Sequence, residues 1–246
     1  MLSFFRHRTH GPTDMTEVRS DMHSHLIPGI DDGAPDMDTC IHLIRGMHEL
    51  GYQKIITTPH VQWEIYKNSS EEITNGYHKV HERLKQERIG VEFSAAAEYF
   101  LDDHFDELIS QDEPLLTFKE NLVLVEFSFI MQPTDLKDKL FRLQIKGYQP
   151  VIAHPERYLY FGVHKNWYDE LKSLDCLFQL NLLSLCGFYG KKQEELAQYL
   201  IKKKYVDLIG TDLHNARHLF VIKSSSSIMD SAKKLLDSGS LLNPLL

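Results

Sequence analysis

Short apolar runs alternate with amphipathic segments along most of the chain, and this alternation constrains the fold more than any other feature. The apolar runs cover residues 21–25, 55–58, 91–97, 122–127, 151–153, 177–180 and 206–209. Between them, helical periodicity predicts helices at residues 37–50, 69–86, 136–146, 191–204 and 219–236. Strands that alternate with helices form parallel sheets through right-handed crossovers. Seven runs therefore predict an α/β fold, with a closed or distorted (β/α) barrel favoured over an open sheet.

Local signals at the helix ends fit this organisation. Ser69 and Glu72 have the spacing of a capping box, and Gly51 and Gly147 follow two of the predicted helices. The last predicted helix contains the run 224–227, four serines that are poor helix formers. The sequence has no linker, repeat or shift in composition. We therefore expect one domain at residues 19–246, preceded by a flexible polar lead-in at residues 1–18.

Composition narrows the class of protein. The 246 residues are 42% hydrophobic and carry a net charge of −8, and the longest basic block is residues 202–204. A nucleic-acid partner held by a basic stripe is therefore not expected. Three cysteines without a C-x-x-C pair argue against a disulfide framework. We find neither a secretory signal nor an apolar run long enough to span a membrane, so we expect a cytoplasmic protein.

Metal-binding residue types follow the apolar runs. Side chains two residues apart on a strand point to the same face. His23 with His25, and Asp212 with His214, could therefore each supply two ligands to one metal ion. In (β/α) barrels the carboxyl-terminal ends of the strands carry the active site. Residues of ligand type at these ends are His23, His25, His60, Glu98, Glu126, His154, Asp212 and His214.

Each of these residues also has a structural interpretation. A single histidine after a strand, such as His60, is more often structural than a ligand, and Asp31 and Asp32 before Gly33 fit an ordinary turn. Glu126 in the run LVLVEFS is harder to explain, because buried carboxylates are almost always paired or bound to a metal. The coincidence at so many strand ends favours a metal site. We expect structural roles for the other histidines, His7, His10, His42, His48, His78, His81, His104, His164 and His218.

Other nucleophilic chemistries lack their signatures. A cysteine phosphatase needs a cysteine, five residues and an arginine, whereas Cys40 and Arg45 are separated by four residues in a helical pattern. The chain also has no G-x-S-x-G elbow and no phosphate-binding P-loop. Thiol and serine chemistry are not expected.

The motifs DMHSHLIPGIDDGA, ITTPH, AAAEYF, VEFS, IAHPERY and GTDLHNARH, taken in this order, resemble those of the PHP (polymerase and histidinol phosphatase) superfamily. The resemblance is closer still to its bacterial protein-tyrosine phosphatases, which act on tyrosine kinases of capsule and exopolysaccharide assembly. It extends from about residue 21 to residue 218. It implies a distorted (β/α)7 barrel, a phosphotyrosine protein as substrate and three divalent metal ions, Mn or Fe with Zn as an alternative.

The resemblance also implies a role for each residue. His23, His25, Glu98 and Asp212 would hold the first metal. Asp32, favoured over Asp31, would hold the second together with His60 and His214. Glu126 and His154 would hold the third, with Glu98 bridging to the first. Arg157 would grip the substrate phosphate, and Arg217 is a weaker candidate for the same role.

The expected reaction is phosphomonoester hydrolysis by a hydroxide that bridges the metals. Tyrosyl phenolate, with a pKa of ~10, is a fair leaving group.

Two other functions remain open. A histidinol-phosphate or other small-molecule phosphatase would use the same ligands, and a metal-stabilised regulatory domain would not turn over substrate. Phe100, Phe129, Tyr158 and Phe188 would line a phosphotyrosine cleft or, more commonly for such residues, cover the barrel rim. The residues do not predict the oligomeric state or the role of the terminal LLNPLL.

Overall fold

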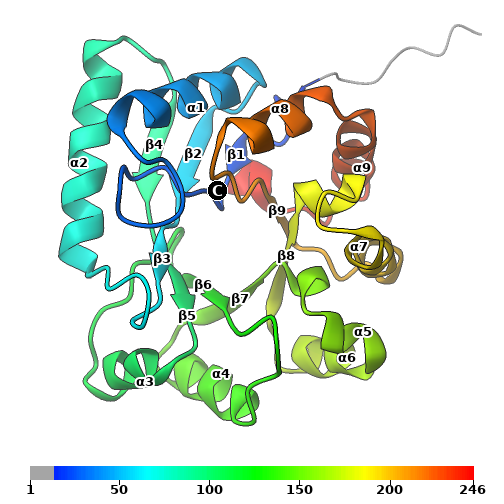
Figure 1. Ribbon diagram of the computed structural model, residues 1–246. Coiled ribbons are helices and arrows are strands. Elements are labelled where there is room, and N and C mark those ends of the chain that lie inside the picture. Colours follow the sequence, from blue (N-terminus) through cyan, green and yellow to red (C-terminus); the bar gives the residue numbers. More distant parts are fainter. Residues whose placement is uncertain (1–13) are drawn as a thin grey trace, which may run out of the picture.

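The computed structural model describes residues 14–246, in which parallel strands form the centre and helices surround them (Figure 1). The strands are β1 (Ser20–Asp21), β2 (Lys54–Thr57), β3 (His60–Val61), β4 (Glu92–Ala95), β5 (Glu98–Phe100), β6 (Leu122–Glu126), β7 (Gln149–Ala153), β8 (Leu177–Asn181) and β9 (Leu208–Gly210). The helices are α1 (Met37–Glu49), α2 (Ser70–Gln86), α3 (Asp103–Ser110), α4 (Leu136–Ile145), α5 (Leu159–Val163), α6 (Asn166–Ser173), α7 (Lys191–Lys203), α8 (Ala216–Ser224) and α9 (Ser226–Asp237).

The strands form two parallel sheets, with the orders β1-β2-β4 and β3-β5-β6-β7-β8-β9. Two of the predicted strands are each followed, after a short break, by a further short strand, so that β3 follows β2 and β5 follows β4. Backbone hydrogen bonds continue across these breaks, from Ala96 to Thr57 and from Glu98 to Pro59. A parallel bridge between Ser24 and Leu213 connects the region after β1 to the region after β9. The predicted α/β class with a parallel sheet is confirmed.

Most predicted helices lie close to their expected positions. The capping box at the start of α2 is present, because Ser69 and Glu72 each bond the other's backbone N–H. The prediction of one helix at residues 219–236 is wrong. Ser225 is extended there, with φ −96° and ψ 108°, and its hydroxyl accepts a hydrogen bond from the N–H of Ile228. The chain therefore ends α8 and starts α9 at this residue.

Two apolar clusters hold the fold together. The larger one lies between the strands and the helices and includes Met15 and Val18, which are buried. The smaller one is built from side chains of successive strands, and Leu242 and Leu246 pack against it. Of the lead-in predicted at residues 1–18, residues 1–13 lie outside the described part of the chain. None of the described helices combines the length and the apolar character needed to cross a membrane.

The carboxyl-terminal segment is tied to the first and last strands. The buried side chain of Asn243 accepts a hydrogen bond from the N–H of Ile209 at 2.9 Å. Its Nδ2 donates to the carbonyls of Ser20 and Ile209, at 2.9 and 2.8 Å. The terminal LLNPLL thus packs on the strands of its own chain and ties β1 to β9.

Candidate metal centre

The structure brings together all the residues that the sequence marks as metal ligands, at the carboxyl-terminal ends of the strands. Each lies within, directly after, or in a loop just beyond a strand, as parallel winding requires. Their ligand atoms lie close enough together to form overlapping groups that could hold metal ions. These residues are His23, His25, Asp32, His60, Glu98, Glu126, His154, Asp212 and His214.

The backbone is strained at two of these residues. His154 follows β7 with φ 33°, and Asp212 lies two residues beyond β9 with φ 49°. Such left-handed conformations are costly for residues other than glycine and cluster at functional sites. Gly210 permits the close packing beside them, because a Cβ at this position would lie 2.7 Å from the Cβ of His23. The strain aims both side chains at the cluster.

The first group of ligand atoms has the spacing of a metal coordination shell. The Nε2 atoms of His23 and His25 lie 3.3 Å apart. Oε2 of Glu98 lies 3.2 and 3.4 Å from these nitrogens, and Oδ1 of Asp212 lies 3.4 Å from each. Four ligands around a divalent ion with bonds of about 2 Å have this separation.

Neighbouring side chains fix which ring nitrogens face the group. Nδ1 of His23 donates to Oε1 of Gln179 at 2.8 Å, and Nδ1 of His25 donates to Oδ2 of Asp31 at 2.8 Å. Each neutral imidazole then carries its lone pair on Nε2. Two lone pairs that face each other at 3.3 Å repel unless a cation lies between them. The arrangement therefore fits a metal ion.

Glu98 gives an independent sign of a cation site. Its side chain is fully buried, and neither carboxylate oxygen receives a hydrogen bond from the described residues. Burial raises the pKa of Glu98, but the neighbouring imidazoles of His23 and His60 outweigh this effect and hold the pKa well below its usual range. An ionised buried carboxylate without hydrogen-bond donors needs positive charge beside it. Divalent metals supply that charge.

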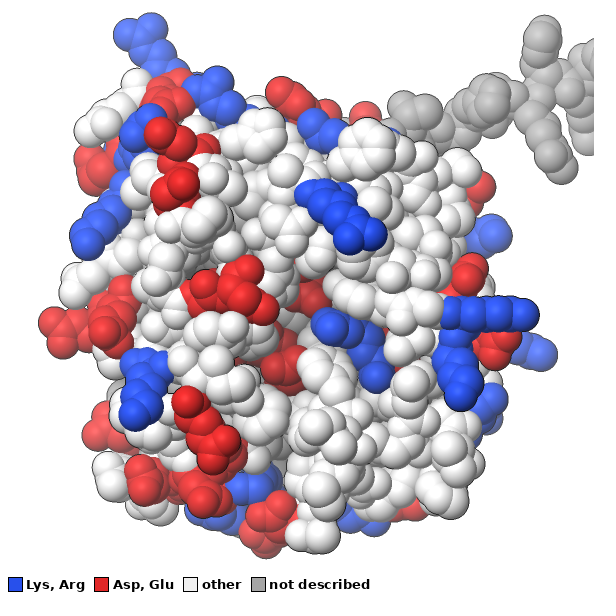
Figure 2. All heavy atoms as spheres, viewed as in Figure 1, with Lys and Arg blue, Asp and Glu red and all other residues white. Residues whose placement is uncertain are grey.

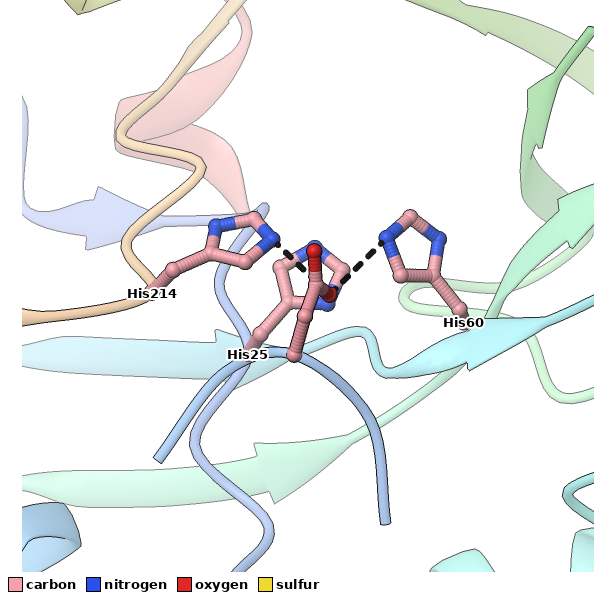
Figure 3. A group of neighbouring side chains, drawn as sticks. His25, His60 and His214 are labelled. Atoms are coloured by element: carbon pink, nitrogen blue, oxygen red, sulfur yellow. Dashed lines mark ion pairs between the residues drawn. The ribbon is translucent and has the colours of Figure 1, made fainter. Parts of the chain in front are cut away.

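The second group of ligand atoms consists of Asp32, His60 and His214, and Asp31 is not part of it. Oδ1 of Asp32 lies 3.5 Å from Nε2 of His60 and 3.4 Å from Nε2 of His214. Figure 3 shows these two rings pointing toward each other across His25. Burial raises the pKa of Asp32, but the hydrogen bond to His214 and the nearby histidine charges lower it to about 2. Asp31 instead holds His25 and accepts the backbone N–H groups of Gly33 and His60.

The third group lies on the other side of Glu98. Nε2 of His154 lies 3.3 Å from Oε1 of Glu98 and 3.3 Å from Oε1 of Glu126. Burial and the charge of Arg157 lower the pKa of His154, but the two carboxylates beside its ring raise it to about 9. Nδ1 of His60 also faces this group, 3.1 Å from Oε2 of Glu98. His60 therefore lies between the second and third groups, one more contact than the resemblance implies.

A cavity of about 420 Å³ opens above the ligands, and acidic side chains lie in the central hollow of this face (Figure 2). Arg157 lines the cavity, and its Nη1 donates to Oδ2 of Asp212 at 2.9 Å. The guanidinium carbon lies 4.6 Å from the ring centre of Phe129 and 4.2 Å from that of Tyr189. Arg217 does not line the cavity. It is exposed, and its guanidinium lies over Phe188.

Several residues of the site are not marked by the sequence pattern. His218, expected to be structural, lines the cavity, and its Nδ1 lies 3.2 Å from the carbonyl oxygen of Asp212. Gln179 and Asn181, both on β8, hold His23 and Asp212. Tyr189 also lines the cavity. Position at the end of β8 is the only sequence signal for Gln179 and Asn181, because the run 177–180 is followed by no charged ligand.

Of the four aromatic residues considered for a phosphotyrosine cleft, only Phe129 lines the cavity. Tyr158 is fully buried, and its ring stacks on Phe127 with 4.1 Å between the ring centres. Phe100 and Phe188 are partly buried and do not contribute to the cavity wall.

Comparison with known proteins places this geometry in context. The tyrosine-protein phosphatase YwqE of Bacillus subtilis is 28% identical over 197 residues, which cover 80% of this chain and 78% of YwqE. The tyrosine-protein phosphatase CpsB of Streptococcus pneumoniae is 26% identical over 201 residues, which cover 79% of this chain and 82% of CpsB.

Solved structures share the fold. A crystal structure from work on YwqE and CpsB, described there as metal-dependent tyrosine phosphatases, matches with a TM-score of 0.76 at 26% identity. The match covers 90% of this chain and 96% of the other. A histidinol phosphate phosphatase of Lactococcus lactis matches over 90% and 93% with a TM-score of 0.56 at 16% identity, which shows a common fold. A model of the capsular polysaccharide synthesis family CpsB/CapC matches residues 19–230, and the chain belongs to this family.

Proposed function

We propose that the protein is a metal-dependent protein-tyrosine phosphatase that dephosphorylates a bacterial tyrosine kinase of polysaccharide assembly. One observation carries the proposal: imidazole lone pairs and buried carboxylates converge beside a cavity that also presents Arg157. Buried carboxylates without hydrogen-bond donors need positive charge beside them, and metal binding would supply it. Membership of the CpsB/CapC family and similarity to named tyrosine phosphatases support the choice of reaction.

The nine clustered residues would hold three divalent ions, Mn or Fe, with Zn as the alternative. His23, His25, Glu98 and Asp212 hold the first. Asp32, His60 and His214 hold the second, and Glu126, His154 and Glu98 hold the third. Mixed imidazole and carboxylate ligands suit these metals better than Ca²⁺. Bound ions would lower the pKa of a water molecule and neutralise charge on the phosphoryl oxygens.

The chain's own side chains would orient the substrate. Arg157 is held by Asp212 and lies against two aromatic rings, so its orientation is set before substrate arrives. Its other N–H groups can donate to phosphoryl oxygens, a geometry in which arginine is strong. Arg217, exposed outside the cavity, is proposed as a weaker candidate for the same contact.

The surroundings of the cavity favour a protein over a small substrate. Ile65, Phe129, Ile130 and Met131, here called the apolar rim, are exposed on the loops after β3 and β6, and Ile130 is 91% exposed. Ile65 and Phe129 line the cavity itself. Contiguous exposed apolar side chains at a cavity mouth are typical of surfaces that bind another molecule. A peptide chain on either side of a phosphotyrosine would contact the whole rim, whereas histidinol phosphate inside the cavity would leave Ile130 and Met131, which do not line it, without contact.

The number of barrel strands, the extent of the domain and the cellular location are further parts of the proposal. We count β2 with β3 and β4 with β5 as interrupted single strands, which gives a distorted (β/α)7 barrel. We also propose a single domain at residues 19–246, with the buried side chains of Met15 and Val18, from the segment predicted as a lead-in, packed in its core. We also propose a cytoplasmic location, where a kinase of polysaccharide assembly would present its phosphotyrosines.

Phosphate release from a phosphotyrosine peptide and from histidinol phosphate, measured side by side on Mn²⁺-loaded protein, tests the proposal. Higher kcat/KM for the peptide is expected. Higher kcat/KM for histidinol phosphate would contradict it and favour the small-molecule phosphatase. Metal binding without hydrolysis of either substrate would favour a metal-stabilised regulatory domain.

A further inference from the structure

Tyr189 lies beside the proposed phosphate-binding arginine. It follows the 3-10 turn Leu182–Cys186 and lines the cavity, with its ring 4.2 Å from the guanidinium carbon of Arg157. The hydroxyl oxygen lies 3.3 Å from Nδ2 of Asn181. The direction of this hydrogen bond decides what the hydroxyl can do in the cavity.

The orientation of the Asn181 amide fixes that direction. The backbone N–H of Leu183 donates to Asn181 at 2.9 Å, so the atom that receives it must be the side-chain oxygen. Nδ2 then points the other way and donates to Oδ2 of Asp212 at 2.8 Å. An amide nitrogen can only donate, so the oxygen of Tyr189 is the acceptor in the third bond.

The hydroxyl proton of Tyr189 is therefore available for another partner. Among residues 14–246 no acceptor for this proton is found, and the side chain opens on the cavity. Burial and the charge of Asp212 raise the pKa of Tyr189, so the group stays protonated. Because the hydroxyl oxygen already accepts a hydrogen bond from Asn181, the orientation of the hydroxyl is restricted, and its proton can be donated to a bound molecule.

We propose that the Tyr189 hydroxyl donates a hydrogen bond to a phosphoryl oxygen of the bound substrate, next to Arg157. The inference rests on the proposed function for the identity of the substrate. Asn181 connects the hydroxyl to Asp212, whose other carboxylate oxygen belongs to the first ligand group. A phosphoryl oxygen close to that group would lie near both donors. Tyr189 would then contribute a neutral hydrogen bond where Arg157 contributes charge.

The substitution Tyr189→Phe tests this role, because it removes the hydroxyl and keeps the ring beside Arg157. A hydrogen bond to a charged group is worth enough to change affinity about tenfold. We expect Mn²⁺-loaded Y189F to bind inorganic phosphate about tenfold more weakly by calorimetry. We also expect kcat/KM for a phosphotyrosine peptide to fall by a similar factor, with unchanged metal content.

Tyr160→Phe is the matched control. The Tyr160 hydroxyl donates to the carbonyl of Ser128 at 2.7 Å and does not line the cavity, so Y160F should bind phosphate like the wild type. Equal phosphate affinity in Y189F and wild type would overturn the inference, as would a wild type that binds metal but no phosphate. Loss of metal in Y189F would also overturn it, because the hydroxyl would then act through Asn181 and Asp212. A wild type that binds phosphate but hydrolyses no phosphotyrosine would contradict the proposed function alone.

Discussion

His23 presents Nε2 to the ligand group because Gln179 accepts the hydrogen of its Nδ1. The same amide oxygen receives the backbone N–H of His154 at 3.2 Å, so one side chain orients two proposed ligands. Side chains that hold metal ligands typically contribute 10- to 100-fold to metal affinity. We therefore expect Gln179→Leu to weaken Mn²⁺ binding by about tenfold or more, measured by titration of chelated protein.

Gln144→Leu provides the control for this prediction. Gln144 donates only to the carbonyl of Leu174, away from the site, and its loss should leave metal affinity unchanged. Equal metal affinity in Q179L and wild type would show that His23 needs no support from Gln179.

Among single residues of the site, the sequence predicts those whose position follows from strand alternation. It does not predict those whose position depends on a left-handed backbone conformation or on three-dimensional packing. His23 and His25 are recognisable because side chains two apart on an extended chain share a face. No pattern marks the positive φ of His154 and Asp212 or the position of Tyr189 beside Arg157. His218 resembles any helix-edge histidine in the sequence, yet the start of α8 carries it back over Asp212.

The apolar rim lies on two loops, and we expect it to contribute to the binding of a peptide substrate. The double substitution Ile130→Ser and Met131→Ser removes two exposed side chains near the cavity mouth. Burial of one large apolar side chain contributes about 1.5–3 kcal/mol. We therefore expect kcat/KM for a phosphotyrosine peptide with apolar flanking residues to fall about tenfold relative to kcat/KM for free phosphotyrosine on the same variant.

Phe141→Ser with Ile145→Ser is the matched control, because both side chains are exposed on α4 and neither lines the cavity. A peptide-to-phosphotyrosine ratio that is the same in the rim variant, the control and the wild type would remove the support that the rim gives to a protein substrate.

Long, strongly periodic elements were the ones that the sequence predicted well. α1, α2 and α7 were expected at nearly their observed positions, and the basic last turn of α7 fits the dipole of a helix. The short helices α3, α5 and α6 were not expected. They have eight, five and eight residues, which gives little periodicity to detect. The division into α8 and α9 depends on one extended residue, Ser225, inside an otherwise helical pattern.

At the scale of the whole molecule, the terminal segment contributes to the stability of the strands. Asn243 makes three hydrogen bonds to the backbone of β9 and β1 and is fully buried. Asn243→Ala would leave these groups unpaired, at a cost of about 1–3 kcal/mol for each buried group left without a partner. We expect urea unfolding to show a loss of stability of about 3 kcal/mol.

Asn121→Ala is the control, since the side chain of Asn121 makes a single, exposed hydrogen bond, to the carbonyl of Gly147. Its loss should cost less than about 1 kcal/mol. Equal stability of N243A and wild type would show that the terminal segment does not connect β1 to β9 in solution.

The measurement that tests the central claim most directly is phosphate release from a phosphotyrosine peptide while Mn²⁺ is titrated into chelated protein, with bound metal counted in parallel. We expect no hydrolysis by the metal-free protein and recovery of activity as the sites fill, up to three ions per chain. Hydrolysis that persists after complete removal of metal would show that catalysis does not depend on metal, and full metal loading without hydrolysis would show that the protein is not a phosphatase.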